Sequence, residues 1–326
     1  MEFRSILRSE MSDFLALRKR SCVKSCYDHD VFYIHSFDRY LFEHNVRSKK
    51  LTESVVTNWI GSLTGKSRTI AGEVITIRIF LSFLKGYGIN PFIPEIPKVH
   101  DDYVPYIYSD KEMEDILSIS DSLIKGRPKT NSFIHLEMPM ILRLMYGCGT
   151  RIGETLSIQM KDVDLDKGCL VLRKTKRNKE RVVPMHESLT AILKDYCYAM
   201  GCIANADAFL FPANEEGCPL TVKSAKHKFD SILAEAGITR DGYGFHERGP
   251  CLHCLRHVFA FKSFSQIEHE GISENDAIPY LSIYLGHDSL NETEKYLKFS
   301  SESFSQDMEL FEKTSASLWP EVDYEF

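Results

Sequence analysis

The chain has 326 residues, which is more than one ordinary hydrophobic core needs and enough for two domains. Hydrophobic residues make up 43% of it and charged residues 26%, the balance of a folded globular protein and not of a disordered or fibrous one. We recognise neither an apolar run long enough to cross a membrane nor a charged-then-apolar leader. We therefore expect a cytoplasmic protein without membrane contact, whose nine cysteines are reduced thiols.

The formal net charge of −6 argues at first sight against a nucleic-acid partner. The charge is unevenly distributed, however. Residues 301–326 carry one basic and seven acidic residues, whereas residues 1–100 carry 15 Lys and Arg against 10 Asp and Glu. Because phosphate binding depends on local basic clusters and not on total charge, the composition does not exclude a DNA partner.

Residues 1–90 are predicted to form an all-helical module, because apolar residues recur there at helical spacing. Basic side chains interleave with the apolar stripes. An all-helical module with exposed Lys and Arg is typical of a DNA clamp, while solvated helix faces are the alternative. The candidate DNA-binding residues here are Arg18, Lys19, Arg20, Lys24, Lys49, Lys50, Lys66 and Arg68.

Four prolines between residues 91 and 105 predict an extended linker over residues 91–108, since helices do not run through such a stretch. A helix restarts at Ser109, which can form a capping box with Glu112. Residues 109–299 are then expected to form a mostly helical second domain. The predicted fold class is mainly α (α+β), with a helical N-terminal domain, a mostly helical second domain and a small β-hairpin.

The hairpin is predicted from two short β-branched segments, residues 168–172 and 181–185. The segment between them, RKTKRNKE, is strongly basic, and it adds Arg173, Lys174, Arg177 and Lys179 to the DNA-binding candidates. Lys176 lies at the tip, where a lysine can protonate a leaving alkoxide in a nucleic-acid groove. A solvated turn is the ordinary alternative.

The stretch GCGTRIGE, residues 147–154, has the features of an anion site. Thr150 is predicted to cap a new helix and Arg151 to project from its first turn, where the helix N-terminus and a guanidinium can act together. Glu154 follows three residues later and can orient Arg151. The alternative is a surface ion pair on a helix.

A second predicted helix places His253, Arg256 and His257 on one polar face, at positions i, i+3 and i+4. Two of these side chains can donate to one phosphate. The competing reading is a zinc site made of Cys251 and Cys254 with His246, His253 and His257, but a CxxC inside a regular helix does not readily converge on a metal ion.

Two further features lie near the C-terminal end. Pro279 is predicted to start a short helix that Gly286 ends, which leaves His287 just beyond it. A capping box of Asn291 and Glu294 then places Tyr296 in the second turn of another short helix.

Taken in order, these features resemble the tyrosine recombinase (phage integrase) family, which includes mobile-element integrases and Xer-type recombinases. The matching stretches are GTRIGE, TKRNKERVVPM, HCLRH and LGHDSLNETEKY. The separation of nine between His287 and Tyr296 is the usual one for the family. The resemblance covers about residues 110–299 strongly, and the helical module before the linker more weakly resembles the family's core-binding domain.

The resemblance implies a role for each matched residue in site-specific DNA strand cleavage and rejoining, without metal, ATP or other cofactor. Tyr296 would be the nucleophile that forms a 3′-phosphotyrosyl link. Arg151 and Arg256 would grip the phosphate, and Glu154 would support the site. Lys176, or else Lys174 or Lys179, would be the general acid, His253 would assist proton transfer, and His287 would hydrogen-bond the phosphate.

The resemblance also implies double-stranded DNA as partner and a tetramer on two DNA sites, with accessory DNA-bending or directionality proteins as further partners. Residues 300–326 are expected to form a C-terminal helix and tail that docks on a neighbouring subunit, with docking in cis as the alternative. The glycine-rich insertion at residues 241–250 has no assigned place. A tyrosine-type topoisomerase and a catalytically inactive DNA-binding protein are the two rival functions.

Overall fold

The computed structural model describes residues 2–99, 105–125, 132–173, 180–214, 217–239, 243, 249–287, 289–290 and 293, without the side chains of residues 268–269 and 274–275. The chain divides into two compact units, Met1–Tyr103 and Val104–Phe326.

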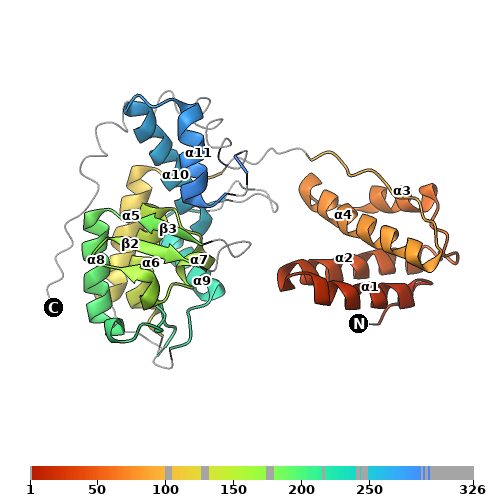
Figure 1. Ribbon diagram of the computed structural model, residues 1–326, viewed down its shortest axis with the longest axis horizontal. Coiled ribbons are helices and arrows are strands. Elements are labelled where there is room, and N and C mark those ends of the chain that lie inside the picture. Colours follow the sequence, from red (N-terminus) through yellow and green to blue (C-terminus); the bar gives the residue numbers. More distant parts are fainter. Residues whose placement is uncertain are drawn as a thin grey trace. The chain divides into compact units, whose positions relative to one another are not determined.

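The first unit is a small helical bundle (Figure 1). Its elements are α1 (Arg8–Ser21), α2 (Lys24–Glu43), α3 (Glu53–Ser62), α4 (Ser67–Leu84) and the short 3₁₀ helix η1 (Lys85–Tyr87). Aromatic side chains fill its centre: Phe37 packs edge-on against both Trp59 and Phe80, and all three are buried. Burial of large apolar groups of this kind supplies most of the stability of such a bundle.

A buried carboxylate joins three of these helices. Asp30 of α2 is 4% exposed. Its Oδ2 lies 2.6 Å from Nε of Arg18 in α1, and its Oδ1 accepts a hydrogen bond of 3.2 Å from the hydroxyl of Thr76 in α4. A buried charge is tolerated when it is paired and hydrogen-bonded, so this contact fixes the three helices relative to one another.

The second unit contains seven α-helices and a small sheet among its described residues. The helices are α5 (Asp110–Ser122), α6 (Ile134–Cys148), α7 (Ile152–Thr155), α8 (Glu187–Ala199), α9 (Val222–Glu235), α10 (Leu252–His269) and α11 (Glu274–Leu285); the short 3₁₀ turns are η2 (Leu123–Lys125), η3 (Met160–Asp162) and η5 (Cys202–Ala204). Helix α6 is buried along nearly all of its length and packs against α5, α8, α9 and α10. A helix that is buried on all sides lies inside a core, and α6 forms the centre of this unit.

The sheet is antiparallel, in the order β1 (Val163–Asp164), β2 (Cys169–Leu172), β3 (Arg181–Pro184). Leu170 pairs with Val183, and Leu172 pairs with Arg181. The predicted hairpin strands and the mainly α fold class are therefore confirmed. β1 was not predicted, because a strand of two residues leaves no periodic pattern. Residues 174–179, at the hairpin tip, lie outside the described residues.

Two local predictions are wrong. Thr150 does not cap α7: its hydroxyl lies 2.7 Å from that of Thr155 in the interior, and Arg151 occupies the cap position instead. Helix α11 does not start at Pro279 but five residues earlier, where the Ser273 hydroxyl caps it by accepting from the backbone of Asp276. The cap of α11 is a local signal that was overlooked, because Ser273 and Asp276 stand at capping-box spacing. The hydroxyl of Thr150 is buried against that of Thr155 and so does not act as a cap.

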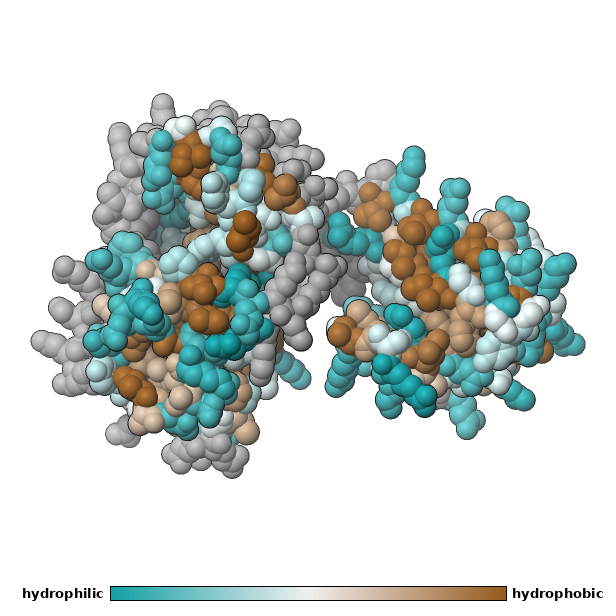
Figure 2. All heavy atoms as spheres, viewed as in Figure 1, coloured by the Kyte–Doolittle hydropathy of each residue, from teal (hydrophilic) through white to brown (hydrophobic). Residues whose placement is uncertain are grey.

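The molecular surface mixes hydrophilic and hydrophobic side chains (Figure 2). Exposed large apolar side chains of the first unit include Val23, Phe32, Ile75 and Ile79. No helix in the described part of the chain is long and apolar enough to span a bilayer. All nine cysteines are free thiols.

Candidate active site

Arg256 lies where two helices end. Its Nη1 donates to the carbonyl of Gly149, the C-terminal cap of α6, over 2.6 Å, and its Nη2 donates to the carbonyl of Leu285, the last residue of α11, over 2.7 Å. Arg256 is 1% exposed. Helix C-termini carry partial negative charge and unsatisfied carbonyls, so a buried guanidinium is stable there and holds the two ends together.

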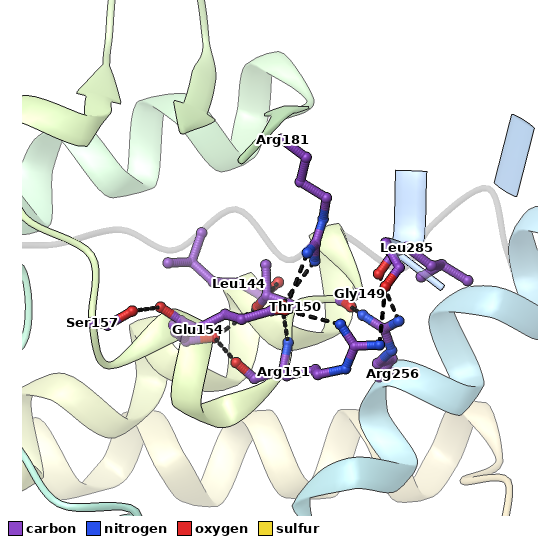
Figure 3. A network of polar contacts seen from close by, with 11 residues as sticks. Leu144, Gly149, Thr150, Arg151, Glu154, Ser157, Arg181, Arg256 and Leu285 are labelled. Atoms are coloured by element: carbon purple, nitrogen blue, oxygen red, sulfur yellow. Dashed lines mark hydrogen bonds and ion pairs between the residues drawn. The ribbon is translucent and has the colours of Figure 1, made fainter. Parts of the chain in front are cut away.

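Arg151 approaches the same place from α7. Its Nη2 donates to the carbonyl of Gly286 over 3.2 Å, one residue beyond the carbonyl that Arg256 uses. Figure 3 shows the two guanidinium groups ending side by side near Leu285. The Arg151 side chain is 26% exposed, so an anion from outside can reach it. Two guanidinium groups beside one another form an anion site, because forked N–H donors match phosphate oxygens.

Glu154 anchors Arg151 from the other side. Its carboxylate accepts from the Arg151 backbone N–H over 3.0 Å and from Arg151 Nη1 over 2.9 Å. The side chain is 4% exposed. Burial by itself raises the pKa of Glu154, but hydrogen bonds from Arg181 and Arg151 outweigh it and hold the pKa at about 2. Glu154 is therefore ionised at neutral pH, as its predicted supporting place beside Arg151 requires.

Arg181 is a site residue that the sequence analysis did not single out. It donates to both carboxylate oxygens of Glu154, over 3.1 and 2.8 Å (Figure 3). The available signal was strand alternation: Val183 is buried, and side chains two residues apart in a strand share a face, so Arg181 points inward with it. The basic residues around it made Arg181 look like part of a solvated hairpin.

The polar face of α10 has one exposed and one buried histidine. His253 lies in the first turn and is exposed, whereas His257 is 8% exposed, and their rings meet edge to face at 4.7 Å. The N-terminus of α10 adds its own partial positive charge beside the arginines. This end of the helix therefore presents His253 and Arg256 from one element, as the spacing predicted.

His287 follows α11, and both its backbone and its side chain form hydrogen bonds. Its backbone N–H donates to the carbonyl of Ser282 over 2.9 Å, and its Nδ1 lies 2.7 Å from the hydroxyl of Thr293. Burial is the largest cause that lowers the pKa of His287, and the positive charges of Arg256, Arg151 and Arg181 lower it further, to about 3. The ring is therefore neutral at physiological pH and acts through hydrogen bonds.

Five predicted site residues are thus brought together by the fold: Arg151, Glu154, His253, Arg256 and His287. Lys176 and Tyr296 lie outside the described residues, as do Lys174, Arg177, Lys179, the capping pair Asn291 and Glu294, most of the 241–250 insertion and the C-terminal segment 300–326.

The remaining DNA-binding candidates differ in their contacts. Arg18 and Lys49 form intramolecular ion pairs with buried carboxylates, those of Asp30 and Glu10, and Arg173 pairs with Asp162. Lys19, Arg20, Lys24, Lys50, Lys66 and Arg68 are exposed, and so are Lys49 and Arg173. To bind a phosphate, Arg18, Lys49 and Arg173 would have to give up part of an ion pair with a buried carboxylate, which makes them the weaker candidates.

The two sulfur atoms of the zinc alternative, Cys251 Sγ and Cys254 Sγ, lie 3.5 Å apart. Within the described ranges no group of three or more His, Cys, Asp or Glu side chains could hold a metal ion. The zinc alternative gains no support from these residues.

Comparison with known sequences gives a consistent result. The model of the phage integrase family matches residues 108–302, more than half of the chain. A Sinorhizobium fredii protein that bears the name integrase/recombinase y4rB is 30% identical over 234 residues, 69% of this chain and 69% of the relative. The tyrosine recombinase XerC of Staphylococcus haemolyticus is 27% identical over 242 residues, 73% of this chain and 72% of the relative.

Solved structures have the same fold at low sequence identity. The XerH site-specific recombinase in a post-cleavage complex with its difH substrate has a TM-score of 0.66 at 18% identity, covering 94% of this chain and 85% of XerH. A lambda integrase tetramer bound to a Holliday junction has a TM-score of 0.60 at 16% identity, covering 88% of this chain and 78% of the integrase.

Proposed function

The chain belongs to the phage integrase family of tyrosine recombinases, and we propose that it cuts and rejoins DNA at specific sites through a covalent bond to Tyr296. The observation that carries the proposal is the meeting of Arg151 and Arg256 at the consecutive carbonyls of Gly286 and Leu285. Phosphoryl transfer builds negative charge on the phosphate oxygens, and paired guanidinium groups are suited to stabilise that charge.

Each remaining site residue has a chemical task in this proposal. The Tyr296 phenol attacks the phosphorus, its proton leaves with the help of His253, and Lys176 protonates the 5′-oxygen as its bond to phosphorus breaks, which releases a 5′-hydroxyl. A free phenol has a pKa near ~10, and neighbouring arginines would lower it. Neutral His287 contributes a hydrogen bond to the phosphate. The phosphotyrosyl ester conserves the energy of the broken phosphodiester bond, so rejoining needs no ATP. The proposed steps use side chains of the protein and no metal ion.

The parts of the chain divide the work. We assign residues 1–90 to DNA binding, residues 91–108 to a linker, residues 109–299 to catalysis and residues 300–326 to docking on a neighbouring subunit. Double-stranded DNA is the substrate, and a tetramer on two DNA sites is the working assembly. The solved structure of a lambda integrase tetramer bound to a Holliday junction supports that assembly. We place the enzyme in the cytoplasm with the DNA it acts on.

The test is covalent capture on nicked duplexes. A library of duplexes with a randomised core, each carrying one nick, is incubated with the full chain, and complexes that survive SDS are isolated. A nick lets the short cleaved fragment diffuse away, so the covalent intermediate accumulates. Sequencing of the captured DNA gives the site, and mass spectrometry of the attached peptide gives the residue. We expect the adduct on Tyr296 and none with Tyr296→Phe.

Capture that persists in Tyr296→Phe, or an adduct on another residue, would refute the assignment. DNA that carries the captured sequence then serves as the substrate for assays that distinguish a recombinase from a topoisomerase. Joining of strands from two differently labelled duplexes identifies a recombinase, whereas relaxation of supercoiled DNA without joining identifies a topoisomerase. Absence of both activities with intact DNA binding would favour the inactive DNA-binding protein.

A further inference from the structure

Arg181 and Glu154 form a buried, two-pronged ion pair. The Arg181 side chain is 11% exposed and that of Glu154 is 4% exposed, and both terminal nitrogens of Arg181 donate to the carboxylate. Two parallel hydrogen bonds fix the orientation of both groups as well as their distance. Because Arg151 donates to the same carboxylate, Glu154 is shared between two arginines.

The net charge of the site depends on this sharing of Glu154. Arg151, Arg181 and Arg256 carry three positive charges and Glu154 one negative charge, a net of +2 for these four side chains. Without Arg181 the carboxylate would be balanced by Arg151 alone. The Arg151 guanidinium would then be held as one half of a neutral pair, and the net charge offered to a phosphate would fall to +1.

The backbone around Arg181 is built to hold it there. Arg181 is the first residue of β3 and pairs with Leu172 across the sheet. Its guanidinium lies against the backbone of Gly286, where a Cβ atom would come within 2.7 Å of Nη1. Gly286 has a φ of +65°, which also favours glycine. The side chain thus touches both the carboxylate behind Arg151 and the turn that carries His287.

From these contacts we propose that Arg181 is a positioning residue of the strand-cleavage site. It takes up the charge of Glu154, so that Arg151 keeps its own positive charge for the scissile phosphate. The inference rests on the proposed function only for the identity of the anion, the scissile phosphate of DNA. The effect of Arg181 on the charge of the site applies to the binding of any phosphate. Arg181 also begins the strand that leaves the hairpin of Lys176, so a structural role is the alternative that the test must separate.

A double-variant cycle that removes the two charges one after the other separates the electrostatic role of Arg181 from a structural one. Arg181→Met lowers the net charge of the four positions to +1, whereas the double variant Glu154→Gln/Arg181→Met returns it to +2 without restoring the ion pair. Binding of inorganic phosphate to the full chain is measured by NMR titration. We expect Arg181→Met to weaken phosphate binding by about tenfold and the double variant to regain most of that loss. A purely structural role predicts that the double variant is no better than the single one.

Two variants guard against loss of folding. Arg181→Lys keeps the charge and loses the two-pronged geometry, so we expect phosphate affinity close to that of the wild type. Arg143→Met is the matched control: Arg143 also forms a buried, two-pronged pair, with Asp121 over 2.6 and 2.7 Å, in the same unit. It should lower stability without weakening phosphate binding.

The pH dependence of His287 gives a second readout. Removal of the nearby Arg181 charge should raise the pKa of His287 in Arg181→Met, whereas Arg181→Lys, which keeps the charge, should leave it low. A purely structural role predicts a rise in both variants, because exposure of the ring also raises its pKa. A double variant that binds phosphate no better than Arg181→Met, or equal weakening by Arg143→Met, overturns the inference. If the phosphate cycle behaves as expected but no covalent DNA capture occurs, the proposed function fails and the role of Arg181 stands.

Discussion

The hydroxyl of Thr293 lies 2.7 Å from Nδ1 of His287 and is fully buried. This contact joins the turn after α11 to the segment that leads, three residues later, to Tyr296. In the tautomer whose Nδ1 accepts from this hydroxyl, the proton of the neutral imidazole lies on Nε2, as the proposed hydrogen bond to a phosphate oxygen requires. Thr293 therefore helps to set the orientation of His287, and it stands three residues before the proposed nucleophile in the sequence.

Thr293→Val is expected to slow covalent capture by about tenfold, because an isosteric side chain without a hydroxyl leaves a buried ring nitrogen without its hydrogen bond. Thr293→Ser should stay close to wild type, since it keeps the hydroxyl. The rate is measured in a single turnover on the captured DNA, with DNA affinity measured in parallel. Equal rates for the Val and Ser variants would show that this hydrogen bond does not contribute to the rate of covalent capture.

His287 is expected to remain neutral throughout the physiological pH range, because burial and three nearby arginines lower its pKa to about 3. An unfolded histidine titrates near ~6.5. The stability that His287 contributes is therefore complete above that pH and is lost as the pH falls toward 3. NMR titration of the ring should show no midpoint between pH 5 and 8. A midpoint near 6 or 7 would contradict a ring that stays neutral across this range.

Much of the fold was predictable because its signals are local. The capping box of Ser109 and Glu112 forms as expected, and the β-branched segments on both sides of the basic stretch pair as a hairpin. The i, i+3 spacing of His253 and Arg256 predicted that one face of α10 carries both side chains. Capping, strand propensity and helical spacing act over a few residues, so the sequence alone displays them.

The missed features depend on contacts between distant segments. Arg181 acquires its partner Glu154 from a position 27 residues earlier, and nothing near Arg181 in the chain indicates that pairing. The Thr150 contact is local, since its partner Thr155 is only five residues away, but it forms because the fold buries both side chains. Tertiary structure selects among partners that are equivalent at the sequence level.

Arg151→Ala and Arg256→Ala should each lose about 2–4 kcal/mol of transition-state stabilisation, measured as the fall in single-turnover cleavage. The two variants should differ in stability. Arg256 joins the ends of α6 and α11, so Arg256→Ala should also lower the melting temperature, whereas Arg151→Ala should do so less. Lys167→Ala, which removes an exposed positive charge, is the control. Cleavage at the wild-type rate in either arginine variant would contradict its role.

Gly149→Ala is expected to disrupt the site by distorting the end of α6. Gly149 has a φ of +58°, and a Cβ there would lie 2.4 Å from the ring of Phe259. Gly201→Ala is a matched control, because Gly201 has a φ of +63° but nothing within 4 Å of the new atom. Backbone strain alone costs about 1–2 kcal/mol. Chemical denaturation should show a larger loss for Gly149→Ala, and equal losses would mean that the ring moves aside.

Glu137→Gln is expected to stabilise the protein at neutral pH. Glu137 is fully buried, and neither carboxylate oxygen has a hydrogen-bond partner among the described residues. Burial raises its pKa to about 8. The folded state therefore keeps a proton that the unfolded chain releases, so this stability contribution is complete below about pH 4.5 and declines as the pH rises to about 8.

At pH 7 this cost amounts to roughly 3 kcal/mol, which a neutral glutamine does not incur. The gain of Glu137→Gln over wild type should therefore grow from pH 5 to pH 8 in urea unfolding experiments. Glu114→Gln, at an exposed position of α5, should change stability by less than about 0.5 kcal/mol at every pH. A gain that does not vary with pH would show that Glu137 is ionised in the folded protein, because only a buried neutral acid makes the difference depend on proton concentration.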